Sequence, residues 1–216
     1  MTIALDINPE SARPWIERAK AEHPSLIDSR HVVDELLGVV NVPSGVWIDE
    51  EGMIVRPAEP AAPERPPRPD RPPGRAGPQP ELSEFTRQVL EEARKIRIDP
   101  HAYTAALRDW AEKGVESRFV LSPDEVIERS GSRGSDESLA AANFEMGQWL
   151  WANGHHDDAP KYWREAHRLF PSNWTYKRQA WSLADPEQGP TELYDSDWLS
   201  DIRKVGAENY YPPLQL

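Results

Sequence analysis

The chain has 216 residues, a net charge of −12 and no cysteine, and it contains 22 prolines and 9 tryptophans. The length predicts one or two domains, and the negative charge, without a basic stripe, argues against a nucleic-acid partner. The absence of cysteine excludes disulfides, thiolate metal sites and thiol chemistry by these residues.

No run of about 18 apolar residues is present, so the sequence predicts no membrane-spanning helix and no membrane partner. The first ten residues, MTIALDINPE, lack the basic segment and the long apolar segment of a signal peptide. We therefore expect a cytoplasmic protein.

The first elements are short. Residues 2–7 form an apolar run that predicts a strand. Asn8 is suited to cap a following helix, which should end before Pro24. Residues 29–38 predict a second short helix, with Gly38 at its carboxyl end.

Residues 39–56, VVNVPSGVWIDEEGMIVR, predict a β-hairpin. Two runs rich in β-branched residues flank an acidic turn that ends at Gly52. Pro43 has no N–H to donate to a strand ladder, so it belongs at the start or edge of its strand. The bond between Val42 and Pro43, at this strand entrance, is a site where a cis peptide is favoured.

The hairpin resembles the second half of a thioredoxin fold, in particular that of ResA/TlpA-like and AhpC/TSA-like redox proteins. The matching residues are Val42-Pro43, Trp47-Ile48-Asp49 and Gly52-Met53-Ile54. The resemblance implies a cis proline facing the redox centre, with Val42 and Pro43 as substrate-binding residues. It also implies thiol–disulfide exchange or peroxide reduction as the activity of the complete protein. An ordinary hairpin with a structural proline is the alternative.

Residues 1–56 thus predict a βααββ unit, an incomplete thioredoxin-like domain. In the family, the strand that enters the redox motif lies between the strands matching 2–7 and 42–48, and its absence leaves two strand edges unpaired. Three explanations stay open. The gene start lies further upstream, for instance before a selenocysteine codon; a partner completes the sheet; or the unit is unrelated and pairs its strands directly. With no catalytic residue and no cofactor, we expect this chain to be inactive in thiol exchange.

Residues 57–80 contain ten prolines among 24 residues and predict a disordered linker without a core. From residue 81 to residue 216 the pattern is helical, so the fold class is α/β plus all-α. Asp99-Pro100 predicts a helix start, and the capping box from Ser122 to Glu125 predicts another.

Residues 138–171 resemble a tetratricopeptide repeat. Gly147, Ala159 and Ala166 match its small positions, and Trp163 matches its large apolar position. Because one repeat with the start of a second is too short to be stable alone, we expect the helices of residues 81–129 and the tail to complete the stack.

The predicted inner face of the repeat includes Phe144, Gln148 and Trp151. This apolar and neutral surface suits a hydrophobic peptide or a neighbouring helix of the same chain, which gives an alternative function as a non-catalytic protein-interaction module. The run His155-His156-Asp157-Asp158 falls at the predicted turn of the repeat, where adjacent side chains diverge, so we expect no metal site there. In the tail, the helically spaced Trp198, Leu199 and Ile202 predict a cap on the stack, and the aromatic end, NYYPPLQL, is an alternative docking peptide.

Overall fold

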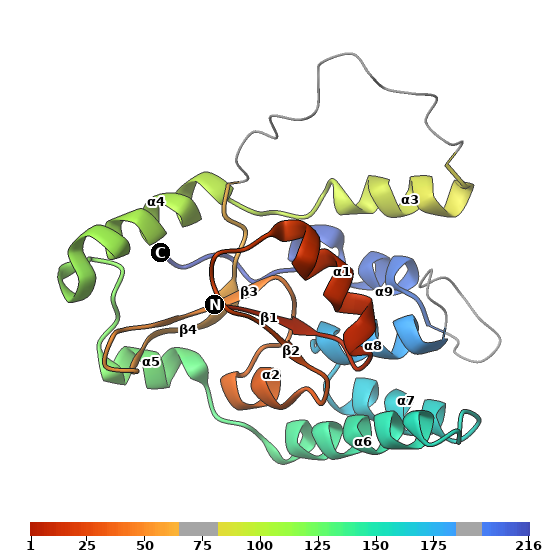
Figure 1. The fold of residues 1–216 in the computed structure, drawn as a ribbon. Helices are drawn as coiled ribbons and strands as arrows, with labels where there is room; N and C mark the ends of the chain where they lie inside the picture. The colour runs from red at the N-terminus through yellow and green to blue at the C-terminus, as the bar shows by residue number, and fades with distance from the viewer. Residues whose placement is uncertain (65–81, 185–195) are drawn as a thin grey trace.

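A computed structural model describes residues 1–64, 82–184 and 196–216 (Figure 1). This part of the chain is mixed helix and sheet, with two separate two-stranded sheets. None of its helices is both long and apolar enough to span a membrane.

The first sheet is a parallel pair. Strands β1 (Thr2–Leu5) and β2 (Ser25–Asp28) are joined by helix α1 (Pro9–Ala19). The Asn8 side chain accepts a hydrogen bond from the backbone N–H of Glu10, which confirms the predicted cap. The prediction for residues 1–56 omitted β2, because its four residues show no clear alternation. The unit is therefore βαβαββ rather than βααββ.

Helix α2 (Val32–Leu37) follows β2 and ends at Gly38, whose φ of 69° confirms the predicted glycine cap. The chain then enters the second sheet, an antiparallel hairpin of β3 (Ser44–Ile48) and β4 (Ile54–Pro60). The bond between Val42 and Pro43 is cis, as predicted, and Pro43 stands just before the strand.

Strand β4 continues beyond the predicted hairpin. It ends at Pro60, and the backbone N–H of Ala61 still bonds to the carbonyl of Pro43 at 3.1 Å. The prediction that the linker begins at residue 57 was therefore wrong, because the strand keeps pairing with the start of β3. Residues 65–80 of the predicted linker lie outside the described part of the chain.

The hairpin shares a core with helix α4 (Pro100–Lys113). The Trp47 ring stacks on that of Trp110 at 4.8 Å, and its indole N–H donates to the Tyr103 hydroxyl at 3.2 Å. A short 3₁₀ turn, η1 (Gly114–Glu116), and helix α5 (Pro123–Ser130) follow, and the predicted capping box at Ser122 is present. The core thus crosses the predicted boundary between the first domain and the helical domain, because a two-stranded hairpin cannot cover Trp47 alone.

The remaining helices form a second core. They are α6 (Ser135–Ala152), α7 (Ala159–Leu169), α8 (Trp174–Ala184), α9 (Trp198–Val205), α3 (Glu84–Ala93) and the short 3₁₀ turn η2 (Ala207–Asn209). Neighbours pack in the order α6, α7, α8, α9, α3. The tail and α3 therefore extend the stack as expected, whereas α4 and α5 pack on the hairpin.

Helices α6 and α7 approach each other closely in this stack. A Cβ atom at Gly147 would lie 2.5 Å from the indole ring of Trp163, which is fully buried. The predicted role of the small residue, to let a second helix carrying a large ring come close, is confirmed.

Candidate functional site

The candidate site surrounds the segment that leads into β3. The carbonyl of Val40 accepts hydrogen bonds from the backbone N–H groups of Trp174 and Thr175, at 2.6 and 3.2 Å. These two residues begin α8, so the free N–H groups of that helix end are used to hold the segment. Val42 is half-buried and Pro43 is exposed.

The carboxyl-terminal tail holds the same segment from another side. The Tyr211 hydroxyl donates to the carbonyl of Val42 at 2.7 Å, and the Asn41 amide donates to the carbonyl of Tyr210 at 3.1 Å. Burial, with the neighbouring Tyr210 adding to it, raises the pKa of Tyr211 to about 12. The hydroxyl therefore keeps its proton at neutral pH and remains a donor.

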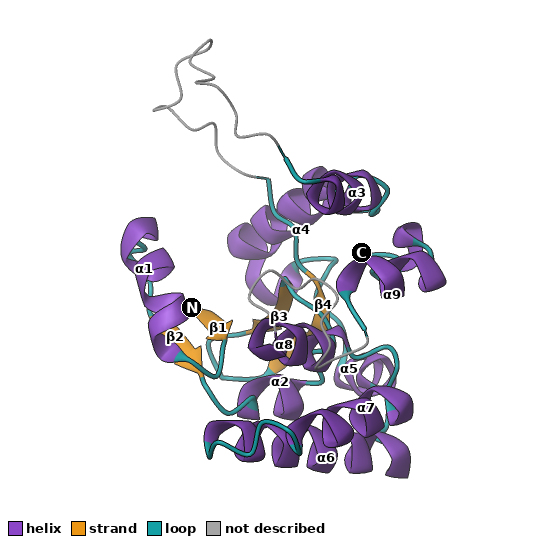
Figure 2. Ribbon diagram, turned by 90° about the vertical axis from the view of Figure 1, so that its right-hand side faces the viewer, coloured by secondary structure: helices purple, strands orange, loops and turns teal. Residues whose placement is uncertain are grey.

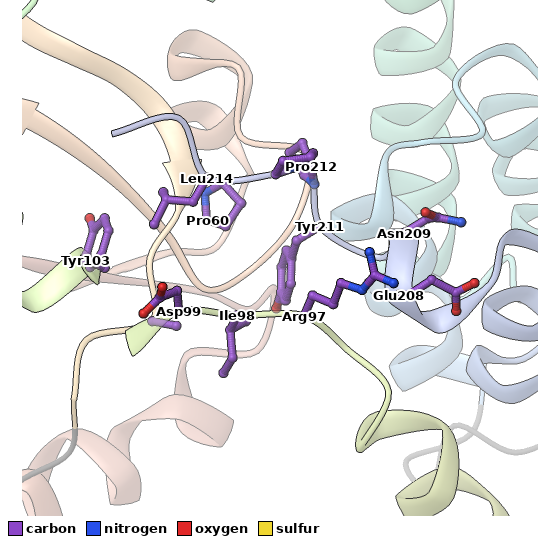
Figure 3. Close-up of a pocket in the computed structure, with 12 residues that line it drawn as sticks. Pro60, Arg97, Ile98, Asp99, Tyr103, Glu208, Asn209, Tyr211, Pro212 and Leu214 are labelled. Carbon is purple, nitrogen blue, oxygen red and sulfur yellow. The ribbon is translucent and has the colours of Figure 1, made fainter. Parts of the chain in front are cut away.

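Two cavities meet at Tyr211. The larger, of about 720 Å³, is lined mainly by apolar residues, and Glu64 is its one charged lining residue. It is lined by Pro43, Pro60, Ala61, Ala62, Pro63, Glu64, Ala93, Ile96, Ile98, Pro100 and Tyr211. The smaller, of about 350 Å³, is shown in Figure 3, where the Tyr211 ring lies between Pro60 and Arg97 and Tyr103 lies at the far end. The walls of the larger cavity suit an apolar ligand, whereas the smaller cavity also has the charged side chains of Arg97, Asp99 and Glu208.

The strand edges beside this segment are unpaired in the described residues. β1 pairs only with β2, and β3 pairs only with β4. Figures 1 and 2 both place β1 between β2 and the hairpin, so the free edges of β1 and β3 lie toward each other. Leu5 and Asp6, at the end of β1, line the same cavity of about 140 Å³ as Val42, before β3. The end of β1 and the residue before β3 therefore border one cavity.

This first unit has few buried apolar side chains. Ala12 is the one buried hydrophobic residue within residues 1–38, whereas Trp15, Leu26 and Leu36 are exposed. Parallel sheets are usually covered on both faces. The β1–β2 pair thus has the composition of a sheet that packs against further structure.

A buried polar cluster connects this unit to the helices. His31 and Asp34 are both buried, with Nδ1 of the imidazole 2.8 Å from the carboxylate. Nε2 lies 3.2 Å from the side-chain oxygen of Gln179 on α8. Burial lowers the pKa of His31. The hydrogen bond and charge of Asp34, together with smaller contributions from Gln179 and Asp28, raise it by more, so the net pKa is raised. The geometry supports a charged imidazolium that donates to both oxygens.

The predicted protein-binding residues of the helical part face inward. Phe144 is buried, stacking on Tyr176 of α8 at 4.2 Å and contacting the His31 ring edge-on at 5.2 Å. Trp151 packs on Trp163 and is half-buried, as is Gln148. Phe144 is therefore covered by a helix of the same chain. The sequence analysis expected either such a helix or a hydrophobic peptide on this face.

The histidine run between α6 and α7 brings no metal ligands together. His155 and His156 are exposed and stack on Trp149 and Trp151 respectively. Within the described ranges, no group of three or more His, Cys, Asp or Glu residues has a geometry that could hold a metal ion.

The sequence analysis missed the residues that join the parts of the molecule. Arg56 is buried, makes two hydrogen bonds to Glu59, and donates to the carbonyls of Phe119 and Gln215. His31 and Arg56 each have one partner three residues away, Asp34 and Glu59 respectively. Their other partners, and the Val42 partner of Tyr211, lie far away in the sequence, so no local pattern could have revealed those contacts. The local signal for the buried cluster was His31, which lies at the start of a short helix and three residues before Asp34.

The comparisons with known proteins add no relative: no protein-family model, no curated protein and no solved structure matches this chain.

Proposed function

We propose that residues 1–60 form the carboxyl-terminal half of a thioredoxin-like fold of the ResA/TlpA or AhpC/TSA type. Its activity, by resemblance, is thiol–disulfide exchange or peroxide reduction. The supporting observation is the pair of free edges on β1 and β3, which lie toward each other beside the cis proline. A strand placed between them would satisfy both edges.

The orientation of the strands is consistent with this proposal. Leu5 and Asp6, at the end of β1, line the same cavity as Val42, before β3. Figures 1 and 2 place β1 next to the hairpin, and this arrangement suits strands that run in opposite directions. A strand inserted parallel to β1 would be antiparallel to β3, and it would end beside Val42 and Pro43. A redox residue directly after that strand would then face the exposed proline.

This chain would contribute substrate binding rather than chemistry. It contains no cysteine, and the thiolate or selenolate is the reacting group in such exchange. Val42 and Pro43 would contact the substrate backbone, and a Cys or selenocysteine would have to come from another segment, whether of the same gene product or of a partner protein.

Reading the genomic DNA in frame upstream of the Met1 codon, with one TGA codon treated as sense, tests the proposal. We expect a strand followed by a Cys- or Sec-containing motif, and the longer protein should reduce insulin disulfides while the 216-residue chain should not. Insulin reduction by the 216-residue chain itself, or an upstream region of stop codons without a partner that supplies the strand, would contradict it.

A second candidate is a non-catalytic interaction module that acts through the helical part. It is favoured by the apolar side chains that α6 leaves exposed on the side away from α7 and α8.

A further inference from the structure

Helix α6 carries an exposed apolar stripe. Leu139, Ala142, Met146 and Trp149 are all exposed, and Leu139 and Trp149 keep 51% and 57% of their surface in solvent. Their spacing of three, four and three residues places them on one face over about 15 Å of helix. We call these four residues the α6 stripe.

The stripe lies opposite the face that packs inside the molecule. Ala140, Phe144 and Gly147 are buried against α7 and α8, so α6 is apolar on both sides. Figures 1 and 2 both show α6 along the lower edge of the molecule. The last helix of a stack normally has a polar outer face, and a helix that is apolar all round is normally buried.

The charges that α6 itself carries have one sign, and a basic residue near them, Arg168, belongs to α7 and interacts with Asp136. Helix α6 contains Asp136, Glu137 and Glu145, and no Lys, Arg or His occurs between Ser135 and Ala152. Asp136 and Glu145 are exposed. A ligand that covers the stripe would therefore gain from positive charge along its edges.

The same charges disfavour a second copy of this chain. A two-fold pairing of stripes would be antiparallel and centred near residue 144, the midpoint of the stripe. Glu145 of each copy would then lie close to Glu145 of the other, and like charges facing each other are destabilising.

We infer that the α6 stripe binds an amphipathic helix of another protein, one with apolar residues at spacings of three and four and with Lys or Arg along its flanks. This inference rests on the second candidate function and names its partner class. Such helix-on-helix recognition uses a few apolar anchors, and Trp149 is the residue type most often dominant at interfaces.

The test uses the full 216-residue chain and two fluorescent helical peptides of about 18 residues, with identical Leu stripes and with Lys or Glu flanks. Binding is measured by fluorescence anisotropy at low and high salt. We expect the Lys peptide to bind at least about tenfold more tightly than the Glu peptide, with a difference that shrinks at high salt.

Two matched variants locate the site. Met146→Glu lies in the stripe, and Ile127→Glu makes the same type of change at a residue of α5 that is 70% exposed. Met146→Glu should weaken binding of the Lys peptide at least about tenfold, while Ile127→Glu should stay within about twofold. Circular dichroism melting of each variant checks that the chain is folded.

Equal binding of both peptides, or equal loss in both variants, would overturn the inference. Light scattering measures the oligomeric state of the native chain and of Met146→Glu. If the native chain is a dimer and Met146→Glu is a monomer, the stripe mediates self-association, and the inference is overturned. Neither result depends on thiol chemistry, so failure here leaves the thioredoxin-like proposal to its own test.

Discussion

The hydroxyl of Tyr211 donates a 2.7 Å hydrogen bond to the carbonyl oxygen of Val42, across 169 positions of the sequence. The carboxyl-terminal tail is thereby fixed to the residue before the cis proline. If Val42 and Pro43 bind substrate, as we propose, the tail forms part of the wall of that site, because Tyr211 lines the cavity beside Pro43.

Replacing Tyr211 with Phe should loosen this attachment. The ring keeps its packing but the Val42 carbonyl loses its donor, so we expect the free energy of unfolding to fall by about 0.5–1.5 kcal/mol. Urea unfolding followed by tryptophan fluorescence measures the loss. Tyr162→Phe, at a half-buried tyrosine of α7, serves as the control and should have the smaller effect. An unchanged stability in Tyr211→Phe would show that the hydrogen bond contributes nothing.

The close packing of α6 and α7 predicts the effect of a single methyl group. Gly147→Ala places a Cβ 2.5 Å from the Trp163 ring, and such overpacking costs about 1–3 kcal/mol. In an exposed helix the same change would stabilise, because Ala exceeds Gly in helix propensity by about 1 kcal/mol. A lower unfolding free energy in Gly147→Ala would therefore support close packing against Trp163. A higher unfolding free energy would contradict it.

A second substitution checks the cause. The variant Gly147→Ala with Trp163→Phe has a smaller ring opposite the added methyl group, so the cost of the alanine should be smaller in that background than in the native one. A double-mutant cycle measures this coupling. Strictly additive effects would mean that the two residues do not compete for space.

Much of the fold follows from local patterns, and the exceptions have physical causes. The hairpin, the caps at Asn8 and Ser122, the glycine end of α2 and the α6–α7 pair were all predicted from spacing and turn chemistry. Strand β2 was not, because four residues with one exposed leucine show no usable periodicity. The extent of β4 was misjudged because proline-rich sequence normally ends a strand.

The contacts between distant segments of the chain could not be predicted from local sequence patterns. Arg56 near the end of a hairpin suggests a solvated charge, yet it is 1% exposed. Its burial depends on carbonyls contributed by Phe119 and Gln215, which only the tertiary fold brings there. The candidate site was predicted in part: Val42 and Pro43 were named, whereas the α8 and tail residues that hold this segment were not.

We predict that replacement by Lys destabilises the protein much more at Arg56 than at Arg129. Both Arg56 and Arg129 donate to the Gln215 carbonyl, at 2.6 and 2.9 Å, but Arg129 lies in an exposed setting while Arg56 is also paired to Glu59 and lies over the Trp47 ring. Arg56→Lys loses the two-pronged pairing and should cost about 3 kcal/mol or more. Arg129→Lys should cost less than about 0.5 kcal/mol. Thermal unfolding of both variants compares them, and similar losses would contradict the assignment.

The buried His31 predicts a stability that depends on pH in a particular direction. Its pKa in the folded protein is raised above the ordinary 6.5. The stabilisation is therefore fully present below about pH 6.5 and is lost as the pH rises through the folded-state pKa. His31→Asn removes the titrating group and leaves the Asp34 carboxylate without its cation, so at pH 6 we expect a loss of about 1–3 kcal/mol.

The difference in unfolding free energy between the native chain and His31→Asn should shrink as the pH is raised from about 6 to 9, because the native chain gives up its imidazolium over that interval. Urea unfolding at several pH values measures this difference. His101→Asn provides the control at an exposed histidine. A difference that grows with pH would mean that His31 is buried as the neutral imidazole, and that the contact between α2 and α8 relies on neutral hydrogen bonds alone.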